Sequence, residues 1–481
     1  MVVFDLPREL IVAWAPPPTR EKILVGRGAH ATRMPFDLII RHGHIVRESG
    51  LGRADVAIED EKIVEIAPEI PGSAREEIDA TGLHIFPGVI DPHVHFNEPG
   101  RTDWEGFATG SSALAAGGGT LFFDMPLNSS PPVLDADSFD LKLEAAKRSS
   151  YTDFALWGGL TPNNLDRMGE LADRGVVGFK GFMCDSGIED FPRADDLTLY
   201  RGMKKAKQLG LPIAVHAESE EITAALTREA LAAGRTSATD YRTSRPIVAE
   251  VEATARAICL AEETGCALHI VHVSNSRSSE LVRLAAARGA DVTCETCPHY
   301  LGWDEHDMDR LGPIAKCAPP LRSPGDVDEL WQDLIENKFA FIASDHSPAP
   351  PEMKRATDGN FFKAWGGIAG VQSTLSILLS RGPGVPATQI ARLTATNAAE
   401  RFRIPAKGST EPGNDADLTL VDVRACYELT RDALLDRHKL SPYVGRTLHG
   451  LVRRTILRGR TIFMDGEMIG PPAGRFMRPV R

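Results

Sequence analysis

Cysteine is scarce in this sequence, with 7 residues in a chain of 481. So few cysteines in a long chain do not form a dense disulfide framework. Their number favours a reducing compartment, the cytoplasm. Cys294-Glu-Thr-Cys297 is the one CxxC pair. Because no second CxxC follows it, a zinc ribbon is not expected, and we interpret both cysteines as strand residues.

Long apolar runs and basic clusters are also missing. No apolar run approaches the roughly 20 residues that span a bilayer, so a membrane partner is not expected. The formal net charge is -12, and no cluster of lysine and arginine offsets it, which argues against a nucleic-acid partner. The hydrophobic share of 42% is typical of a globular protein, and the length exceeds that of one ordinary domain.

The first 33 residues contain proline and arginine and carry little periodic pattern. We expect residues 1–35 to form a disordered N-terminal extension. Their apolar run, residues 10–15, is too short for the core of a signal peptide. An alternative hypothesis is that Met34 is the true start of the protein.

Two distant segments share one sequence pattern, in which short β-type runs are separated by glycine and acidic residues. One covers residues 36–90 and includes Ala54-Asp-Val-Ala-Ile58. The other covers residues 408–481 and includes Ala416-Asp-Leu-Thr-Leu-Val421. Because both flank a middle of different character, we predict one small β-sandwich built from the two chain ends.

Between these segments, residues 91–407 alternate strand and helix patterns, and the first strand candidate begins just before them. Eight strands alternating with helices predict an α/β fold, a (β/α)8 barrel of the TIM type, whose chemistry lies at the C-terminal strand ends. The strand candidates are residues 84–90, 120–125, 154–157, 176–183, 213–216, 268–273, 292–297 and 341–344.

Polar residues at these strand ends form a restricted set. In Asp91-Pro-His-Val-His95 the two histidines point to one face, because side chains alternate along a strand. Imidazole is a common metal ligand, so the pair is a candidate half-site. Five strands direct histidine, lysine or aspartate toward one rim of the barrel: His93, His95, Lys180, His216, His272 and Asp345.

Lys180 lies inside the apolar strand candidate Gly178-Phe-Lys-Gly-Phe-Met183. Desolvation disfavours its charged form, and a neutral amine can add carbon dioxide to become a carbamate. Such an anionic group is able to bridge two cations. Four histidines, one carbamate and one aspartate suit two metal ions roughly 3.5–4 Å apart.

The run from Asp91 to Gly106 resembles the cyclic amidohydrolases of the amidohydrolase superfamily and, within them, most closely the allantoinases. The resemblance extends over nearly everything from about Phe36 onward. Further motifs that carry it are Asp124-Met-Pro-Leu-Asn-Ser-Ser-Pro-Pro132, Gly178-Phe-Lys-Gly-Phe-Met-Cys-Asp-Ser-Gly187, Val215-His-Ala-Glu218, Glu295-Thr-Cys-Pro-His-Tyr-Leu301, Lys316-Cys-Ala-Pro-Pro320, Ser344-Asp-His-Ser-Pro348, Ala364-Trp-Gly-Gly367 and Ser441-Pro-Tyr443.

This resemblance implies the metal arrangement. His93, His95 and Asp345 are expected on one ion and His216 and His272 on the other. Lys180, carboxylated at N6, is expected to bridge two divalent cations, with Zn²⁺ the expected metal. The resemblance also implies a homotetramer. Asp345 is the expected catalytic residue: it accepts a proton from the attacking water and returns it to the departing ring nitrogen.

The substrate follows from two positions. Resemblance to dihydroorotase calls for an arginine two residues after the histidine pair, and Asn97 stands there. Resemblance to hydantoinase calls for a tyrosine five residues after the lysine, and Asp185 stands there. The expected reaction is therefore hydrolysis of the ring amide of allantoin to allantoate, with a hydantoinase or dihydropyrimidinase as the alternative.

Other residues near the rim are expected to contact the substrate or to orient the ligands. For Arg101 an ion pair with Asp103 or Glu105 is an equal alternative. His299 and His346 flank strand ends and are expected to orient metal ligands, with a packing role for each as the open alternative. The expected substrate-binding residues are Asn97, Arg101, Asn128, Cys184, Asp185, Ser186 and Ser347.

Two non-enzymatic hypotheses remain beside this one. In the first, the chain has lost ligands and acts as an assembly scaffold, as some chains of this type do. In the second, the metal set serves only to hold the fold together. All six positions are filled here, whereas structural zinc sites are closed by four ligands. The complete set therefore favours an enzyme.

Overall fold

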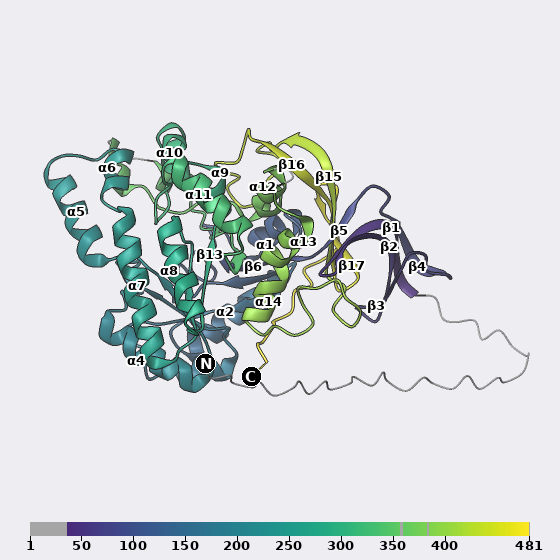
Figure 1. Cartoon of the computed structure of the whole chain (residues 1–481), viewed down its shortest axis with the longest axis horizontal. Coiled ribbons are helices and arrows are strands. Elements are labelled where there is room, and N and C mark those ends of the chain that lie inside the picture. The colour runs from purple at the N-terminus through teal and green to yellow at the C-terminus, as the bar shows by residue number, and fades with distance from the viewer. Residues whose placement is uncertain (1–35, 356–358, 382–383, 481) are drawn as a thin grey trace, which may run out of the picture. The chain divides into compact units, whose positions relative to one another are not determined.

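The computed structural model describes residues 36–355, 359–381 and 384–480, so the extension expected for residues 1–35 lies outside the described residues (Figure 1). The described chain combines a barrel of parallel strands, covered by helices, with a β-rich domain from both chain ends. The predicted fold class is thereby confirmed. None of the helices in these ranges has the length and hydropathy to cross a membrane.

Hydrogen bonding joins the barrel strands in chain order. β6, β7 and β8 form one parallel group, and β9 to β14 form another. Trp157 separates β8 from β9, and a parallel bridge between Val94 and His346 closes the ring. The strands are β6 (Val89–Val94), β7 (Gly119–Asp124), β8 (Asp153–Leu156), β9 (Gly158–Gly159), β10 (Phe179–Phe182), β11 (Ile213–His216), β12 (Leu268–Ile270), β13 (Val292–Thr296) and β14 (Phe341–Ile342).

Helices cover the outside of the barrel, and neighbours such as α4 and α7 pack on one another (Figure 1). The strands inside are buried along their whole length in β6, β7 and β11, as expected for parallel strands covered on both faces. The helices are α1 (Phe107–Ala116), α2 (Ala136–Ser149), α3 (Met168–Arg174), α4 (Asp196–Leu209), α5 (Glu220–Ala232), α6 (Ala238–Thr243), α7 (Ile247–Thr264), α8 (Ser276–Ala287), α9 (Pro298–Gly302), α10 (Glu305–Leu311), α11 (Pro324–Ile335), α12 (Thr374–Ser380), α13 (Ala387–Ala391) and α14 (Asn397–Arg401).

Short helical turns complete the connections. They are η1 (Gly312–Ala315), η2 (Pro351–Lys354), η4 (Phe361–Lys363), η5 (Val371–Ser373) and η6 (Arg392–Thr396).

Local sequence explains where helix α4 begins and ends. Its N-cap residue Asp195 accepts a hydrogen bond from the amide of Thr198, which satisfies one of the free N–H groups of the first turn. At the other end Gly210 adopts a left-handed backbone with φ of 68°, a conformation that glycine adopts without strain. The polar and glycine residues thus bound an amphipathic segment that packs on the barrel.

The β-rich domain joins both chain ends in one hydrogen-bonded sheet, which has nine strands in the described residues. Its N-terminal strands are β1 (Phe36–Arg47), β2 (Gly50–Glu59), β3 (Lys62–Ala67), β4 (Ala74–Asp79) and β5 (His84–Pro87). The C-terminal strands are β15 (Leu418–Glu428), β16 (Thr447–Leu457), β17 (Arg460–Met464) and β18 (Glu467–Met468). β5 pairs with both β1 and β15 and so connects the two sets.

One sequence prediction needs correction here. The single strand candidate of residues 84–90 is two strands, because β5 belongs to the β-rich sheet and β6 begins the barrel. The residues from Phe36 onward form one compact unit. The predicted boundaries between the barrel and the β-rich domain therefore stay a prediction. The core of the β-rich part draws on both chain ends, for example Ile40, Ile58 and Ile456.

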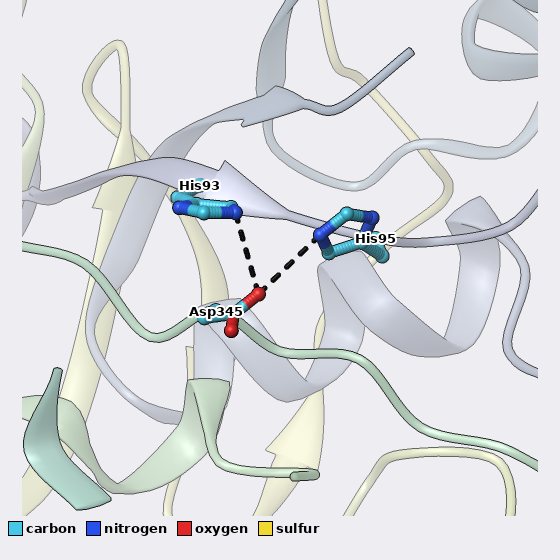
Figure 2. A group of neighbouring side chains, drawn as sticks. All are labelled: His93, His95 and Asp345. Atoms are coloured by element: carbon cyan, nitrogen blue, oxygen red, sulfur yellow. Dashed lines mark ion pairs between the residues drawn. The ribbon is translucent and has the colours of Figure 1, made fainter. Parts of the chain in front are cut away.

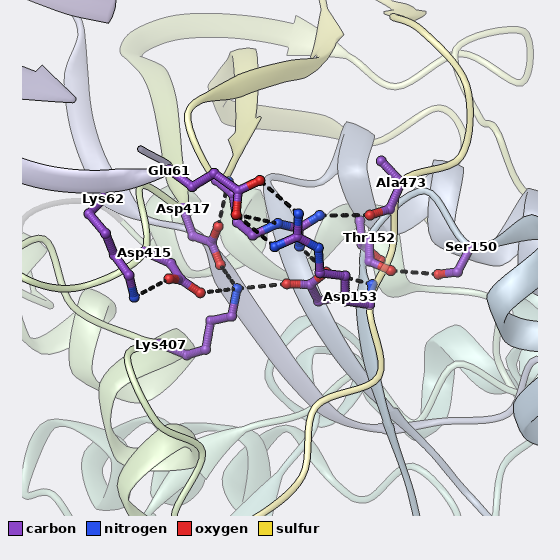
Figure 3. A network of polar contacts seen from close by, with 11 residues as sticks. Glu61, Lys62, Ser150, Thr152, Asp153, Lys407, Asp415, Asp417 and Ala473 are labelled. Carbon is purple, nitrogen blue, oxygen red and sulfur yellow. Dashed lines mark hydrogen bonds and ion pairs between the residues drawn. The ribbon is translucent and has the colours of Figure 1, made fainter. Parts of the chain in front are cut away.

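A buried ionic network links the β-rich domain to the barrel (Figure 3). Nζ of Lys407 lies 2.6 Å from Asp153 at the start of β8 and 2.7 Å from Asp417, just before β15. It also lies 2.8 Å from Asp415, and Arg458 forms a further ion pair with Asp153. Because Asp153 begins its barrel strand, this network lies at the end opposite the predicted site.

Candidate active site

The six predicted metal ligands meet in one place. All of them line a single cavity of about 290 Å³ at the C-terminal ends of the barrel strands. Three lie within strands: His93 in β6, Lys180 in β10 and His216 at the end of β11. The other three follow strand ends within three residues: His95, His272 and Asp345.

His93, His95 and Asp345 form the tightest group (Figure 2). Oδ1 of Asp345 lies 3.3 Å from Nε2 of His93 and 3.3 Å from Nε2 of His95. One ligand atom from each residue lies within 4.8 Å of the others. Two imidazole nitrogens and a carboxylate oxygen aimed at a common point suit a divalent cation.

His216 and His272 lie beside this group. Their ring centroids are 4.5 Å apart, and the ring of His272 is 5.6 Å from that of His93. Burial lowers the pKa of both His216 and His272, which keeps the imidazoles neutral in the form that binds a metal. Four imidazoles therefore border one cavity.

Two of these residues have unusual backbone conformations. His272 has φ of 41° and Asp345 has φ of 46°, a left-handed region that is uncommon outside glycine. Such strain persists only where the surrounding structure imposes it, and it is concentrated at functional sites. The backbone thus turns sharply at two of the six positions.

Lys180 is fully buried, and its Nζ has no hydrogen-bond partner among the described residues. Burial lowers its pKa to about 8, although Asp345 and Glu295 oppose the shift. The amine lies 5.1 Å from the ring centroid of Phe182. The lowered pKa favours the neutral amine, and a buried neutral amine without a hydrogen-bond partner is chemically suited to form a carbamate.

Glu295, at the end of β13, was missed in the sequence analysis. Its Oε1 lies 2.5 Å from Nδ1 of His93, and its Oε2 lies 3.0 Å from Nε2 of His269. A carboxylate at Nδ1 fixes the ring orientation and leaves Nε2 facing Asp345. Burial, reinforced by Lys180 and His95, also holds the pKa of His93 well below its ordinary value.

Glu218 plays the corresponding part for His216. Its Oε2 lies 2.7 Å from Nε2 of His216, which leaves Nδ1 available, and 2.5 Å from the guanidinium of Arg245. Burial alone would raise the pKa of Glu218, but Arg245 and His216 lower it to about 2. Cys184 also approaches His216 and Glu218. Because Arg245 already neutralises the carboxylate, we do not interpret these three residues as a second cation site.

Four of the predicted substrate-binding residues line the cavity: Asn128, Asp185, Ser186 and Ser347. Nδ2 of Asn128 lies 3.5 Å from Oγ of Ser347, which joins the loops after β7 and β14. Asp185 also accepts a hydrogen bond from the amide of Gly187 at 3.0 Å, so its loop is ordered by its own side chain.

The other three lie outside the cavity lining. Asn97 is buried and contacts the carbonyl oxygen of Pro348 at 3.4 Å. Arg101 donates to the carbonyl oxygen of Asn128 at 2.8 Å and lies over the ring of Trp104, so neither of its expected ion pairs accounts for it. Cys184 is buried, which raises the pKa of its thiol to about 12.

The orienting role expected of two histidines needs correction. Both ring nitrogens of His299 are without a hydrogen-bond partner among the described residues, so it holds no ligand side chain. Nδ1 of His346 accepts hydrogen bonds from the amides of Gly370 and Val371. Its contact with a ligand is through the backbone, since its carbonyl oxygen accepts from the amide of His95 at 2.8 Å.

Several cavity residues were not assigned a role from sequence. Lys316 and residues 364–367 belong to motifs that carried the resemblance, but the motifs alone did not indicate that they meet at the cavity. Tyr241 lies in α6, and Arg245 lies two residues after the end of that helix. No sequence motif indicated a role for either residue. The additional lining residues are Leu127, Phe182, Gly187, Tyr241, Arg245, Lys316, Cys317, Ala318, Phe362, Ala364, Trp365, Gly366 and Gly367.

Curated relatives match almost the whole chain. An allantoinase of Rubrobacter xylanophilus is 56% identical over 449 residues, which cover 93% of this chain and 98% of that protein. One of Solibacter usitatus is 55% identical and covers 92% and 97%. One of Escherichia coli is 44% identical and covers 92% and 99%.

Solved structures agree with the fold. An L-hydantoinase from Arthrobacter aurescens superposes with a TM-score of 0.90 at 33% identity, over 92% of this chain and 100% of that one. A D-hydantoinase has a TM-score of 0.85 at 32% identity, with 92% and 99% covered. The model of the amidohydrolase family matches residues 84–462. The resemblance to allantoinases is thus confirmed, and the chain belongs to the amidohydrolase family.

Proposed function

We propose that this chain hydrolyses the ring amide of allantoin to allantoate, as the names of its curated relatives indicate. The observation that carries the proposal is the convergence of six side chains from five strands on one cavity. This cavity is of a size that admits a small cyclic amide, and its metal-binding groups lie at one part of its lining.

The residues fit two divalent cations. His93, His95 and Asp345 would hold one and His216 and His272 the other, with carboxylated Lys180 between them. The unpartnered buried Nζ of Lys180 and the neutral imidazoles support this assignment. Zn²⁺ suits the nitrogen and oxygen donors. When bound, such ions polarise a carbonyl and lower the pKa of water.

The side chains of the protein have separate roles in this reaction. Asp345, which lies in the lining, takes the proton of the attacking water and passes it to the ring nitrogen as the amide bond breaks. Glu295 and Glu218 hold His93 and His216 in one ring orientation. Asn128, Asp185, Ser186 and Ser347 offer polar groups to the substrate from three loops.

A hydantoinase or dihydropyrimidinase activity is the second candidate, supported by the close superposition on hydantoinases. A substrate panel decides between them: allantoin, hydantoin, dihydrouracil and dihydroorotate, with the metal content measured on the same sample. We expect the highest kcat/KM with allantoin and about two metal ions per chain. A preference for hydantoin or dihydrouracil would reject the proposal in favour of the second candidate.

Two further proposals concern the oligomeric state of the enzyme and the compartment in which it lies. The resemblance alone suggests a homotetramer, which light scattering after size-exclusion chromatography tests. All seven cysteines are unpaired, which supports a reducing compartment such as the cytoplasm.

A further inference from the structure

One side of the cavity is formed by a single short segment, residues 361–367, which we call the wall segment. It contributes Phe362, Ala364, Trp365, Gly366 and Gly367 to the lining. It begins with the turn η4 and lies further along the chain than the loop that carries both Asp345 and Ser347. The shape of the cavity around a substrate therefore depends on how this segment is held.

Lys316 reaches into the wall segment from the loop after η1. Its Nζ lies 2.9 Å from the carbonyl oxygen of Phe361, 3.1 Å from that of Phe362 and 2.5 Å from that of Ala364. The side chain is buried and lies 4.6 Å from the ring centroid of Tyr241. One lysine nitrogen thus contacts three backbone carbonyl oxygens of the wall segment.

Lys354, at the end of η2, binds the other half of the segment. Its Nζ donates to the carbonyl oxygen of Gly367, to that of Trp365 at 3.1 Å and to that of Pro313 at 3.4 Å. A lysine ammonium has three N–H donors, and each of these two lysines meets three carbonyl oxygens. Five of these six carbonyl oxygens belong to the wall segment. Burial lowers the pKa of both lysines to about 7, so near neutral pH each nitrogen is shared between its ammonium and amine forms.

Backbone contacts extend the same attachment toward the predicted substrate residues. The amide of Gly367 donates to the carbonyl oxygen of Lys316 at 2.7 Å, and that of Ser347 donates to Ile368 at 3.0 Å. Gly367 has φ of 150°, and a Cβ there would lie 2.3 Å from the carbonyl oxygen of Ser347. The wall segment and the Ser347 loop are consequently in direct backbone contact.

We propose that Lys316 and Lys354 are positioning residues for substrate selection, which act by holding the wall segment in place. This inference rests on the proposed function, because it assigns a role in choosing among cyclic amides. The metal ligands act on the scissile amide, so a substituent elsewhere on the ring meets the remaining lining. A displaced wall segment therefore impairs substituted rings more than an unsubstituted ring.

The test uses Lys316→Met and Lys354→Met, since methionine keeps an unbranched apolar chain but has no donor. Lys147→Met is the matched control, because Lys147 is exposed on α2 and pairs with Glu144 within the helix. We expect kcat/KM for allantoin to fall by about tenfold or more, chiefly through KM, while that for hydantoin falls less than about threefold. The metal content of both variants should equal that of wild type.

Hydrogen–deuterium exchange provides a readout that needs no substrate. In both methionine variants the amides of residues 361–368 should exchange faster, whereas the control should match wild type. Lys316→Arg and Lys354→Arg keep the charge and several donors, so they should restore part of the allantoin preference. If a methionine variant fails to fold, the arginine variants still allow the substrate preference and the exchange to be compared with wild type.

Equal losses for allantoin and hydantoin, or unchanged exchange across residues 361–368, would overturn the role of the two lysines. Failure of wild type to prefer allantoin would overturn the proposed function instead. In that case the exchange measurement, together with a substituted and an unsubstituted amide that wild type does hydrolyse, still decides the role of the lysines.

Discussion

Glu295 and His93 are joined by a 2.5 Å contact between a carboxylate oxygen and Nδ1, deep in the barrel, where both side chains are 1% exposed. The carboxylate also reaches His269, so its position is fixed from two sides. Since Nδ1 of His93 is occupied in this way, Nε2 is the nitrogen that faces Asp345. The ring orientation of one proposed ligand thus depends on a residue that contacts no substrate.

Replacing Glu295 with Gln tests this dependence. An amide is a weaker acceptor than a carboxylate, so we expect the metal affinity to fall about 10–100-fold, with the fold retained. Competition with a chromogenic chelator measures the affinity directly. Thr293→Ser, a small change at the other partner of His269, is the control and should leave the affinity unaltered. Wild-type affinity in Glu295→Gln would show that His93 is oriented without its partner.

Asp345 is proposed to move a proton as well as to bind metal, and Asp345→Asn separates the two roles. Asparagine keeps an oxygen ligand but cannot accept the proton, so the turnover number should fall about 10²–10⁴-fold. Some metal should remain bound, as elemental analysis of the same sample will report. Full activity in this variant would refute the proton-transfer role.

The bridging role of Lys180 is tested by Lys180→Ala. Loss of the carbamate should lower the metal content, because no other anionic group in the described lining replaces it between the two sets of histidines. Short carboxylic acids added to the buffer should restore part of the metal content and activity by filling the vacant volume. Lys147→Ala serves as the control. An unchanged metal content in Lys180→Ala would contradict a bridging carbamate.

The sequence predicted those site residues whose chemistry is local to a strand end. Lys180 and His216 stand out because an apolar strand carries a polar residue at or near its C-terminal end, and parallel strands bring these ends together. The same reasoning missed Glu295, whose role depends on its distance to His93, more than two hundred positions away. Its place at the end of β13 gives the same local signal as that of Lys180 and His216, but only the contact with His93 indicates what the residue does.

Proximity to a strand end also misled the prediction for some residues. His299 follows β13, but it lies in the short helix α9, which begins with Pro298, and its ring centroid is 4.3 Å from that of Tyr300. The run of residues 84–90 contains Pro87-Gly88, a dipeptide typical of turns, where β5 ends and β6 begins, but this signal alone does not indicate that the two strands belong to different sheets. Side-chain direction and strand partner are tertiary properties, which a one-dimensional pattern does not encode.

The network around Lys407 leads to a prediction about stability that is independent of the active site. Lys407 is buried among Asp153, Asp415 and Asp417, which join the barrel to the β-rich domain (Figure 3). Lys407→Met leaves buried carboxylates without their cation, so we expect the free energy of unfolding to fall by about 3–5 kcal/mol. Denaturant unfolding of the metal-loaded protein at pH 7 measures the loss, with exposed Lys147→Met as the control.

The pH dependence of this loss follows from the same contacts. Burial lowers the pKa of Lys407, but Asp417, Asp153 and Asp415 outweigh it and raise the pKa above its ordinary value. A group whose pKa is raised on folding stabilises the protein fully below its unfolded pKa of about 10.4, and that contribution is lost as the pH rises through the folded pKa. The difference between wild type and Lys407→Met should therefore stay constant from pH 7 to about pH 10 and shrink above it. A difference that already shrinks between pH 7 and pH 9 would mean that the three aspartates do not hold the lysine charged.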